Sequence, residues 1–238
     1  MGLEGPRVIG AALDRGAAIE SIYVGAGSMR AFAPLVQRAV ATGAHVAELK
    51  EGVLEKIGTT RTPQPVLAVV DRPRCSLDDL AVEGSLLVLV DVADPGNVGT
   101  IIRSAEAAGL AGVVVCGSSV DVSNPKVVRS SAGAVFGVAT VEADDAMVTL
   151  EQLGRTGRRR LATRAEGGQP LYDVDFSGAS AIVLGNEAHG LSDALESVID
   201  GWITIDLAPP AESLNVAMAA SIVAFEVARQ QRSHEATP

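Results

Sequence analysis

The fold of this chain is decided by one stretch, Ile182-Val183-Leu184-Gly185-Asn186-Glu187-Ala188-His189-Gly190-Leu191-Ser192. An apolar strand runs into a loop flanked by glycines, and Ser192 is placed to cap a following helix. Gly185 lets a ligand approach the backbone, and Asn186 and Glu187 supply polar groups at the strand end. The spacing and the lysine of a P-loop are absent. His189 could act as a general base, but an ordinary surface histidine is the simpler interpretation.

Strands and helices alternate on both sides of this stretch. The pattern predicts strands over 86–90, 113–116, 160–163, 181–184 and 202–205, and helices over 98–108, 125–131, 146–153, 193–198 and 213–232. The strands are apolar on both faces, which is typical of a parallel sheet covered by helices. Ligands of such sheets collect at the carboxyl ends of the strands. Small residues on the last helix suit core packing, or close approach to another helix at a subunit interface.

A second motif follows the first of these strands, Asp94-Pro95-Gly96-Asn97-Val98-Gly99-Thr100-Ile101-Ile102-Arg103. Pro95-Gly96 predicts a turn, and Asn97 is a good helix N-cap. Arg103 lies less than two turns after Asn97, so we expect both to address one end of the sheet. The alternative is a capped helix that carries a solvated arginine.

A third motif links the last strand to the last helix, Ile203-Thr204-Ile205-Asp206-Leu207-Ala208-Pro209-Pro210-Ala211-Glu212-Ser213-Leu214-Asn215-Val216. Ser213 and Asn215 are expected in the first turn of that helix. Free backbone N–H groups and the positive end of the helix dipole favour an anionic group there. Capping by Ser213 alone would explain Ser213 but not Asn215.

In this order, the three motifs resemble the SpoU/TrmH branch of the SPOUT methyltransferases, with its N-x-G-x-x-x-R, G-N-E-x-x-G-L-S and S-L-N-V signatures. The resemblance covers roughly residues 86–232. It implies an α/β fold with a knotted parallel-sheet domain (a trefoil knot), a homodimer formed through this C-terminal domain, and S-adenosylmethionine as cofactor. No metal is expected. A Rossmann-type enzyme is the alternative, but its G-x-G-x-x-G fingerprint is absent.

The resemblance also assigns roles to residues. Those expected to hold the cofactor, largely through backbone atoms and apolar walls, are Thr163, Leu184, Gly185, Asn186, Ile205, Leu207 and Leu214. Arg103 would activate or orient the ribose 2′-OH. A guanidinium with a pKa above about 12 is a poor proton acceptor, so an RNA phosphate clamp is easier to defend than a base. Asn97, Glu187, Ser213 and Asn215 would complete the catalytic site.

The first part of the chain predicts a smaller α/β domain over 1–75, joined by a linker at 76–84 to the methyltransferase domain at 85–238. The segment at 3–9 resembles the opening helix of an RNA-binding domain, related to a ribosomal protein, that many family members carry. A strand usually precedes that helix; here it is expected to be missing, or the given start to be too late. The expected phosphate contacts are Arg7, Arg30, Arg61 and Arg72.

Charge and composition limit the other possibilities. The formal net charge of −10 argues against a nonspecific nucleic-acid binder, although residues 1–83 are nearly neutral, with 9 Lys/Arg against 10 Asp/Glu. The 16 arginines against 3 lysines suit phosphate and base contacts, but a GC-rich genome would explain them equally well. Neither a membrane span nor a signal peptide is visible. Cys75 and Cys116 lack metal-ligand spacing, and Cys116 reads as a buried thiol in the reducing cytoplasm.

The sequence therefore predicts an S-adenosylmethionine-dependent enzyme that methylates a ribose 2′-OH in structured RNA. The N-terminal domain favours ribosomal RNA as the substrate. Two alternatives stay open: a tRNA ribose methyltransferase, and a non-catalytic RNA-binding or ribosome-assembly factor that retains the cofactor fold.

Overall fold

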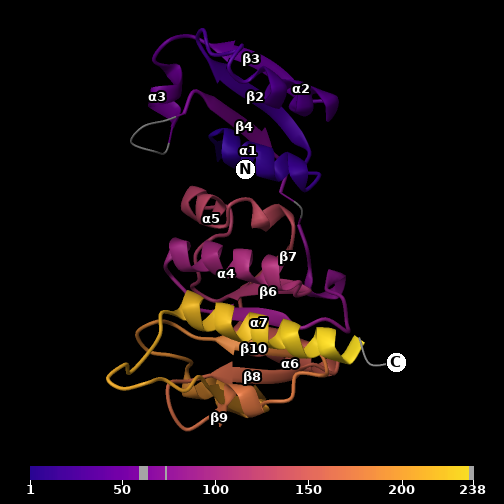
Figure 1. The fold of residues 1–238 in the computed structure, drawn as a ribbon, viewed down its shortest axis with the longest axis vertical. Helices are drawn as coiled ribbons and strands as arrows, with labels where there is room; N and C mark the ends of the chain where they lie inside the picture. Colours follow the sequence, from indigo (N-terminus) through magenta and orange to yellow (C-terminus); the bar gives the residue numbers. More distant parts are fainter. Residues whose placement is uncertain (59–63, 73, 236–238) are drawn as a thin grey trace.

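The computed structural model describes residues 1–58, 64–72 and 74–235, and it builds them around two sheets (Figure 1). The N-terminal sheet has the strand order β1-β4-β2-β3, with β1 and β4 antiparallel to their neighbours and β2 and β3 parallel. Its elements are β1 (Gly2–Glu4), α1 (Pro6–Asp14), β2 (Ile19–Gly25), α2 (Ala33–Ala41), β3 (His45–Leu49), α3 (Val53–Ile57) and β4 (Val66–Val70).

Strand β1 corrects the expectation that the strand before α1 is missing. Leu3 pairs with Ala68 of β4, and its side chain is fully buried. The strand has only three residues and one buried side chain, too few for an alternating pattern to be visible in the sequence. It forms because its backbone pairs with that of β4, which lies more than sixty residues away in the sequence.

The C-terminal sheet has the strand order β7-β6-β5-β10-β8-β11-β9, and every neighbouring pair is parallel, as predicted. Its strands are β5 (Leu86–Val90), β6 (Gly112–Cys116), β7 (Ala139–Ala143), β8 (Arg159–Thr163), β9 (Gln169–Pro170), β10 (Ser180–Leu184) and β11 (Gly201–Thr204). Strands β7 and β9 were not predicted from the sequence. Both lie at sheet edges, where a strand needs little apolar patterning, and β9 has only two residues.

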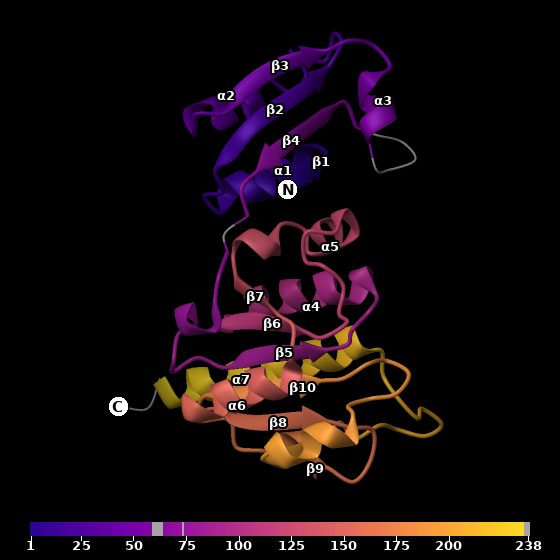
Figure 2. The ribbon, with the colours of Figure 1, turned by 180° about the vertical axis from the view of Figure 1, so that it is seen from behind.

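Helices cover both faces of this sheet (Figures 1 and 2). The helices are α4 (Pro95–Ala108), α5 (Pro125–Ser130), α6 (Ala146–Arg155) and α7 (Val216–Glu235), with the 3₁₀ turns η1 (Leu77–Asp79), η2 (Ala134–Phe136), η3 (Leu171–Asp173) and η4 (Asp193–Val198). Helices α4 and α7 pack on one face, and α6 with η4 packs on the other. No helix among the described residues is both long and apolar enough to cross a membrane.

The two sheets meet at α5. Val127 belongs to the core beneath α4 and α7, whereas the next residue, Val128, belongs to the core of the N-terminal sheet. A side-chain ion pair links Arg15, just after α1, to Glu106 of α4 at 2.5 Å. Helix α5 is therefore shared by both cores, and α4 is tied to the N-terminal domain at its far end.

Candidate active site

A cavity of about 170 Å³ lies at the carboxyl ends of β8, β10 and β11, where an open parallel sheet is expected to bind its ligand. Every residue predicted to hold the cofactor lines it: Thr163, Leu184, Gly185, Asn186, Ile205, Leu207 and Leu214. Two residues of α7, Val216 and Ala219, close one side. Sequence analysis did not include them because they look like ordinary core positions. The walls are mostly apolar and suit a flat ligand whose few polar groups meet backbone atoms and the rim.

The loop after β10 is folded by the side chain of Asn186. Its Oδ1 accepts hydrogen bonds from the backbone N–H groups of Ala188 (2.9 Å) and His189 (3.2 Å), and its Nδ2 donates to the carbonyl of Asp91 (2.9 Å). Gly185 must be glycine, because a Cβ there would lie 2.6 Å from the carbonyl oxygen of Gly190. This loop is thus held against the end of β5, and both polar atoms of the Asn186 side chain are engaged within the protein.

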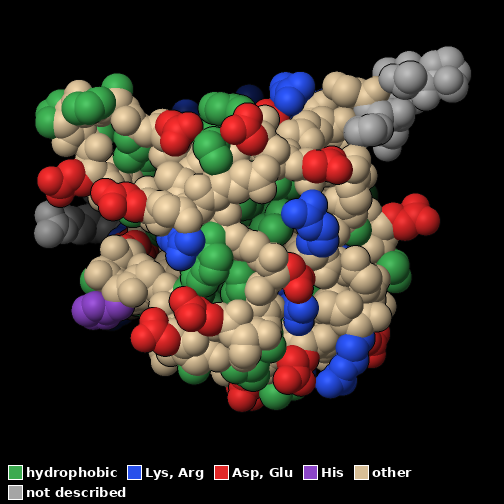
Figure 3. Space-filling model, turned by 90° about the horizontal axis from the view of Figure 1, so that it is seen from below, with side chains coloured by type: hydrophobic (Ala, Val, Ile, Leu, Met, Phe, Trp, Pro, Cys, Tyr) green, Lys and Arg blue, Asp and Glu red, His purple; other side chains and the backbone are tan. Residues whose placement is uncertain are grey.

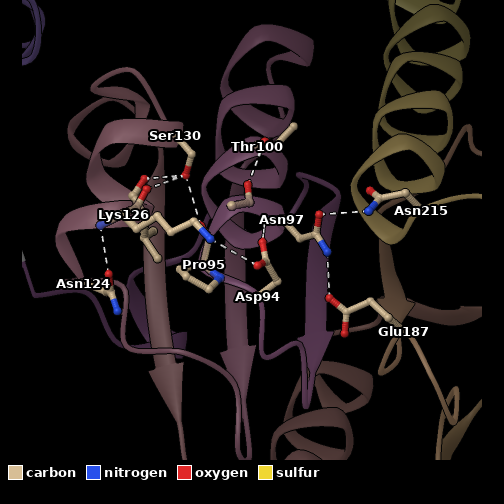
Figure 4. A network of polar contacts seen from close by, with 11 residues as sticks. Asp94, Pro95, Asn97, Thr100, Asn124, Lys126, Ser130, Glu187 and Asn215 are labelled. Carbon is tan, nitrogen blue, oxygen red and sulfur yellow. Dashed lines mark hydrogen bonds and ion pairs between the residues drawn. The ribbon is translucent and has the colours of Figure 1, made fainter. Parts of the chain in front are cut away.

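A chain of side-chain hydrogen bonds joins the three motifs (Figure 4). Asn97 Nδ2 donates to Glu187 Oε1 at 2.8 Å, and Asn215 Nδ2 donates to Asn97 Oδ1 at 3.1 Å. Glu187 also lines the cavity. Residues that are 90 and 118 positions apart along the sequence therefore meet at one place. The other oxygen of Glu187, Oε2, makes no hydrogen bond to any residue that the structure describes.

The start of α4 differs from the prediction. Asp94, not Asn97, is the N-cap, and it accepts a hydrogen bond from the backbone N–H of Asn97 at 2.9 Å. Pro95 occupies the first helical turn instead of a preceding turn. The same hydrogen bond lowers the pKa of the Asp94 carboxyl. Because Asp94 supplies the cap, the side chain of Asn97 is left available to join Glu187 and Asn215.

The start of α7 also needs a correction. The helix begins at Val216 rather than at Ser213, and it runs to Glu235. Asn215 Oδ1 accepts the backbone N–H of Ala217 at 2.9 Å, so Asn215 is the residue that caps the helix. Ser213 lies in the preceding loop, where it lines the cavity. One asparagine therefore caps α7 through its oxygen and binds Asn97 through its nitrogen.

The structure does not bring Arg103 to this cavity. Six residues place it about 9 Å along α4 from Asn97 and about 240° around the axis. Its side chain is exposed, and within the described ranges it forms no hydrogen bond or ion pair. His189 is exposed as well, and its backbone N–H is the group that Asn186 binds.

Gly99, the glycine of the second motif, serves packing. A Cβ at this position would lie 2.5 Å from the carbonyl oxygen of Val127 and 2.8 Å from the backbone nitrogen of Ser131. Glycine therefore allows α4 and α5 to approach closely, backbone against backbone. The sequence shows the glycine but not the helix that it faces.

The arginines predicted to bind RNA differ in their surroundings. Arg7 and Arg30 are exposed. Arg72 is already engaged: its Nη1 lies 2.6 Å from Glu142 Oε2 of β7, and its side chain is 15% exposed, so it ties the end of β4 to the C-terminal sheet. Arg61 lies outside the residues that the structure describes.

Two further groups were singled out by the sequence. Cys116 is buried, and desolvation raises the pKa of its thiol to about 11, whereas Cys75 is half-buried. No cluster of His, Cys, Asp or Glu suited to a metal ion occurs within residues 1–58, 64–72 and 74–235.

With this geometry established, the chain can be compared with known proteins. Residues 84–225 match the SpoU rRNA Methylase family, and residues 2–68 match the MRM3-like substrate binding domain. This chain belongs to the SpoU rRNA methylase family. The resemblance inferred from the three motifs is confirmed.

The relatives include two named rRNA enzymes. The 23S rRNA (uridine(2479)-2′-O)-methyltransferase of Streptomyces viridochromogenes is 33% identical over 96% of this SpoU-family chain and 82% of its own length. The 23S rRNA (guanosine(2553)-2′-O)-methyltransferase RlmP of Bacillus subtilis is 34% identical over 78% of this chain and 73% of its own length. The crystal structure of the SpoU methyltransferase AviRb from Streptomyces viridochromogenes, in complex with the cofactor AdoMet, superposes with a TM-score of 0.85 at 30% identity. That match covers 98% of this chain and 91% of the other.

Proposed function

We propose that this SpoU-family chain transfers a methyl group from S-adenosylmethionine to a ribose 2′-OH in ribosomal RNA. The observation that carries the proposal is the cavity at the sheet edge, where the cofactor loops meet the hydrogen-bonded chain of Glu187, Asn97 and Asn215. Relatives that cover most of this chain are named as 23S rRNA 2′-O-methyltransferases, and a neighbouring structure holds AdoMet.

The residues of the cavity fit this cofactor. When bound, S-adenosylmethionine supplies a methyl group that is already activated on a sulfonium sulfur. The apolar walls, among them Leu184, Ile205 and Leu214, would hold the adenosyl group, and the backbone at Gly185 would accept its polar edge. With the methyl already activated, the protein mainly has to align the ribose oxygen and exclude water.

Glu187 is proposed to orient the ribose. Asn97 holds its Oε1, while its Oε2 is free to accept a hydrogen bond from the 2′-OH. Asn215 fixes Asn97, so the carboxylate keeps one orientation and loses little freedom when RNA arrives. Ser213 lines the same cavity and would contact the nucleotide or the cofactor from the opposite loop.

Arg103 is proposed to act on the active site of a second subunit. Its helix, α4, packs against α7, which exposes Met218 (56%) and Phe225 (47%) on a strip that also includes Ile222. Solvent-exposed apolar side chains at this spacing suit a two-fold interface formed by the same helices of two copies. Arg103 is exposed and directly precedes Ser104, whose hydroxyl lies 2.7 Å from that of Ser221 on α7, so it could then clamp a phosphate of the RNA bound to the partner.

A mixing experiment tests this arrangement. Arg103→Ala and Glu187→Gln are each expected to be inactive alone. Refolded or co-expressed together, they would form mixed dimers with one intact composite site and regain up to about a quarter of the activity, as expected for random pairing at a two-fold interface. Mixtures as inactive as the parents, from a protein that is dimeric by light scattering, would contradict the shared site.

Two further proposals rest on family membership. The C-terminal domain is proposed to be knotted, a suggestion supported by β10, which inserts between β5 and β8, both of which precede it in the sequence. Because the proposed substrate is ribosomal RNA, the protein is also proposed to act in the cytoplasm.

The reaction itself can be tested directly. Purified protein and labelled S-adenosylmethionine are incubated with total rRNA and, separately, with total tRNA from a strain that lacks the gene. Nucleoside analysis should find a 2′-O-methylated ribose in rRNA. Label only in tRNA would favour the tRNA alternative, and RNA binding without label in either pool would favour a non-catalytic factor.

A further inference from the structure

Helix α5 connects the N-terminal domain to the active site. Its two buried valines, Val127 and Val128, enter different cores, so the helix cannot shift without disturbing both domains. Ser130 Oγ donates to the carbonyl of Pro95 at 3.1 Å, in the first turn of α4. Asn97 belongs to that same first turn. A ligand held on α5 is therefore held in a fixed position relative to Asn97 and Glu187.

Two cations, Lys126 and Arg129, lie one turn apart on α5; Lys126 is exposed, whereas Arg129 is half-buried and already interacts with another group of the protein. The Lys126 side chain is 57% exposed. Arg129 lines a groove of about 460 Å³ between α5 and α1, together with Arg7, Val8 and the carboxylate of Glu4. This groove is continuous with the N-terminal domain at one end of α5, while Lys126 reaches toward α4 at the other (Figure 4).

Lys126 is held only loosely. Its Nζ lies 3.4 Å from Asp94 Oδ2, and both side chains are about half exposed, so the pair contributes little stability. Asp94 does not depend on it, because the carboxylate already caps α4 through the backbone N–H of Asn97. Lys126 could exchange this partner for a phosphate without leaving a buried charge unpaired.

Three other cations of this acidic domain lie away from α5 and pair with carboxylates. Arg155, Arg160 and Arg229 each pair with a carboxylate, on Glu151, Asp200 and Glu226 respectively. Seen from the end that carries β9, acidic side chains are spread across the surface with basic ones between them, and no basic patch is visible (Figure 3). An RNA backbone would find a better electrostatic match at the junction than on that end of the molecule.

We propose that the RNA backbone reaches the active site along α5, where Lys126 and Arg129 contact its phosphates. This inference rests on the proposed function and names the path that the substrate takes between the N-terminal domain and Glu187. Lys126 and Arg129 act as positioning residues: they place the ribose but do not touch the reacting atoms.

The test uses the full-length chain and deproteinised 23S rRNA. Lys126→Ala and Arg129→Ala should each weaken rRNA binding about threefold to tenfold, and each should lower the slope of log affinity against log salt by about one, as expected for one lost phosphate contact. Arg155→Ala is the matched control, since that exposed arginine lies on α6, across the sheet, and should change neither quantity. Binding of S-adenosylmethionine by calorimetry should stay as in the parent protein.

A second pair of variants separates an RNA contact from a structural role. Asp94→Asn keeps an oxygen to cap α4 but releases Lys126, so rRNA affinity should stay the same or rise. Lys126→Arg should restore the affinity that Lys126→Ala loses. A loss in Asp94→Asn equal to that in Lys126→Ala would overturn the proposal, as would parental rRNA affinity in both alanine variants at every salt concentration.

These readouts distinguish the path from the chemistry. If no 2′-O-methyl group is formed but rRNA binding still depends on Lys126 and Arg129, the path stands and the proposed reaction fails. If methylation proceeds with parental KM in both alanine variants, the reaction stands and the path is rejected.

Discussion

The strands of the two sheets are buried to very different extents. In β5, β6 and β10 of the C-terminal sheet every residue is buried, whereas β3 of the N-terminal sheet is exposed at four of its five positions. The C-terminal sheet is covered by helices on both faces, and its loops project from strands that are fully buried. The core of the N-terminal sheet includes Val128, a residue of α5 in the C-terminal region. The candidate active site therefore lies in the region whose buried cores are built from its own residues, whereas the core of the N-terminal sheet includes a residue of α5.

The largest expected effect is on turnover, and it comes from substituting a residue of the C-terminal region. Arg103→Ala should lower methylation by about 10²-fold or more, the loss expected when the reacting groups are misplaced by about 1 Å. Cofactor affinity should survive, because Arg103 does not line the cavity. Arg30→Ala, an exposed arginine of the N-terminal domain, is the control and should alter KM alone. Near-normal turnover of Arg103→Ala would remove it from the mechanism.

The same contrast explains what could be predicted from the sequence. Strands buried on both faces are apolar throughout, so β5, β6 and β10 were visible, and two of the three motif loops come after β5 and β10. The residues assigned to the cofactor all line the cavity, because the sequence pattern placed them at strand ends and in the motif loops. Short or edge strands such as β1 and β9 have no such pattern, since their partners lie far away in the sequence.

Contacts between distant residues were the part that could not be predicted. Asn97 reads as a cap from its neighbours alone, and only the fold shows that Asp94 has taken that role and that Asn97 faces Glu187 and Asn215. The position of Arg103 around helix α4, by contrast, could have been predicted. Six residues of helix turn it about 240° from Asn97, so helical geometry applied to the sequence would have separated the two.

The second effect concerns the contact between α4 and α5. Gly99→Ala should destabilise the protein by about 3 kcal/mol, the upper range for overpacking, because backbone atoms of α5 would have to move. Gly178→Ala is a matched control: nothing lies within 4 Å of the added methyl group, and the backbone is not left-handed. Urea unfolding measures both. Equal midpoints for the two variants would show that α5 can move away from α4, and that the contact between these helices is not rigid.

The third effect is a loss of stability, and it compares the two hydrophobic cores through two adjacent residues of α5. Val128→Ala removes two methyl groups from the N-terminal core and Val127→Ala removes two from the C-terminal core, each costing about 2 kcal/mol. Hydrogen exchange should show faster opening of β2 and β4 in the first variant and of β5 and β6 in the second. If both variants accelerate exchange uniformly, the two sheets unfold as one unit.

The smallest effect concerns the alkylation rates of the two cysteines. It compares the buried C-terminal sheet with the segment between the two sheets. With the pKa of Cys116 raised to about 11 by burial, only about one thiol in a thousand is ionised at pH 8, and the thiolate is the reactive form. Half-buried Cys75, in the segment between the sheets, should therefore be alkylated first. Cys116 should react only as fast as the C-terminal sheet opens, so low concentrations of urea should accelerate its labelling more than that of Cys75. Equal rates for both thiols in native buffer would mean that β6 is exposed far more often than a strand buried at every position should be.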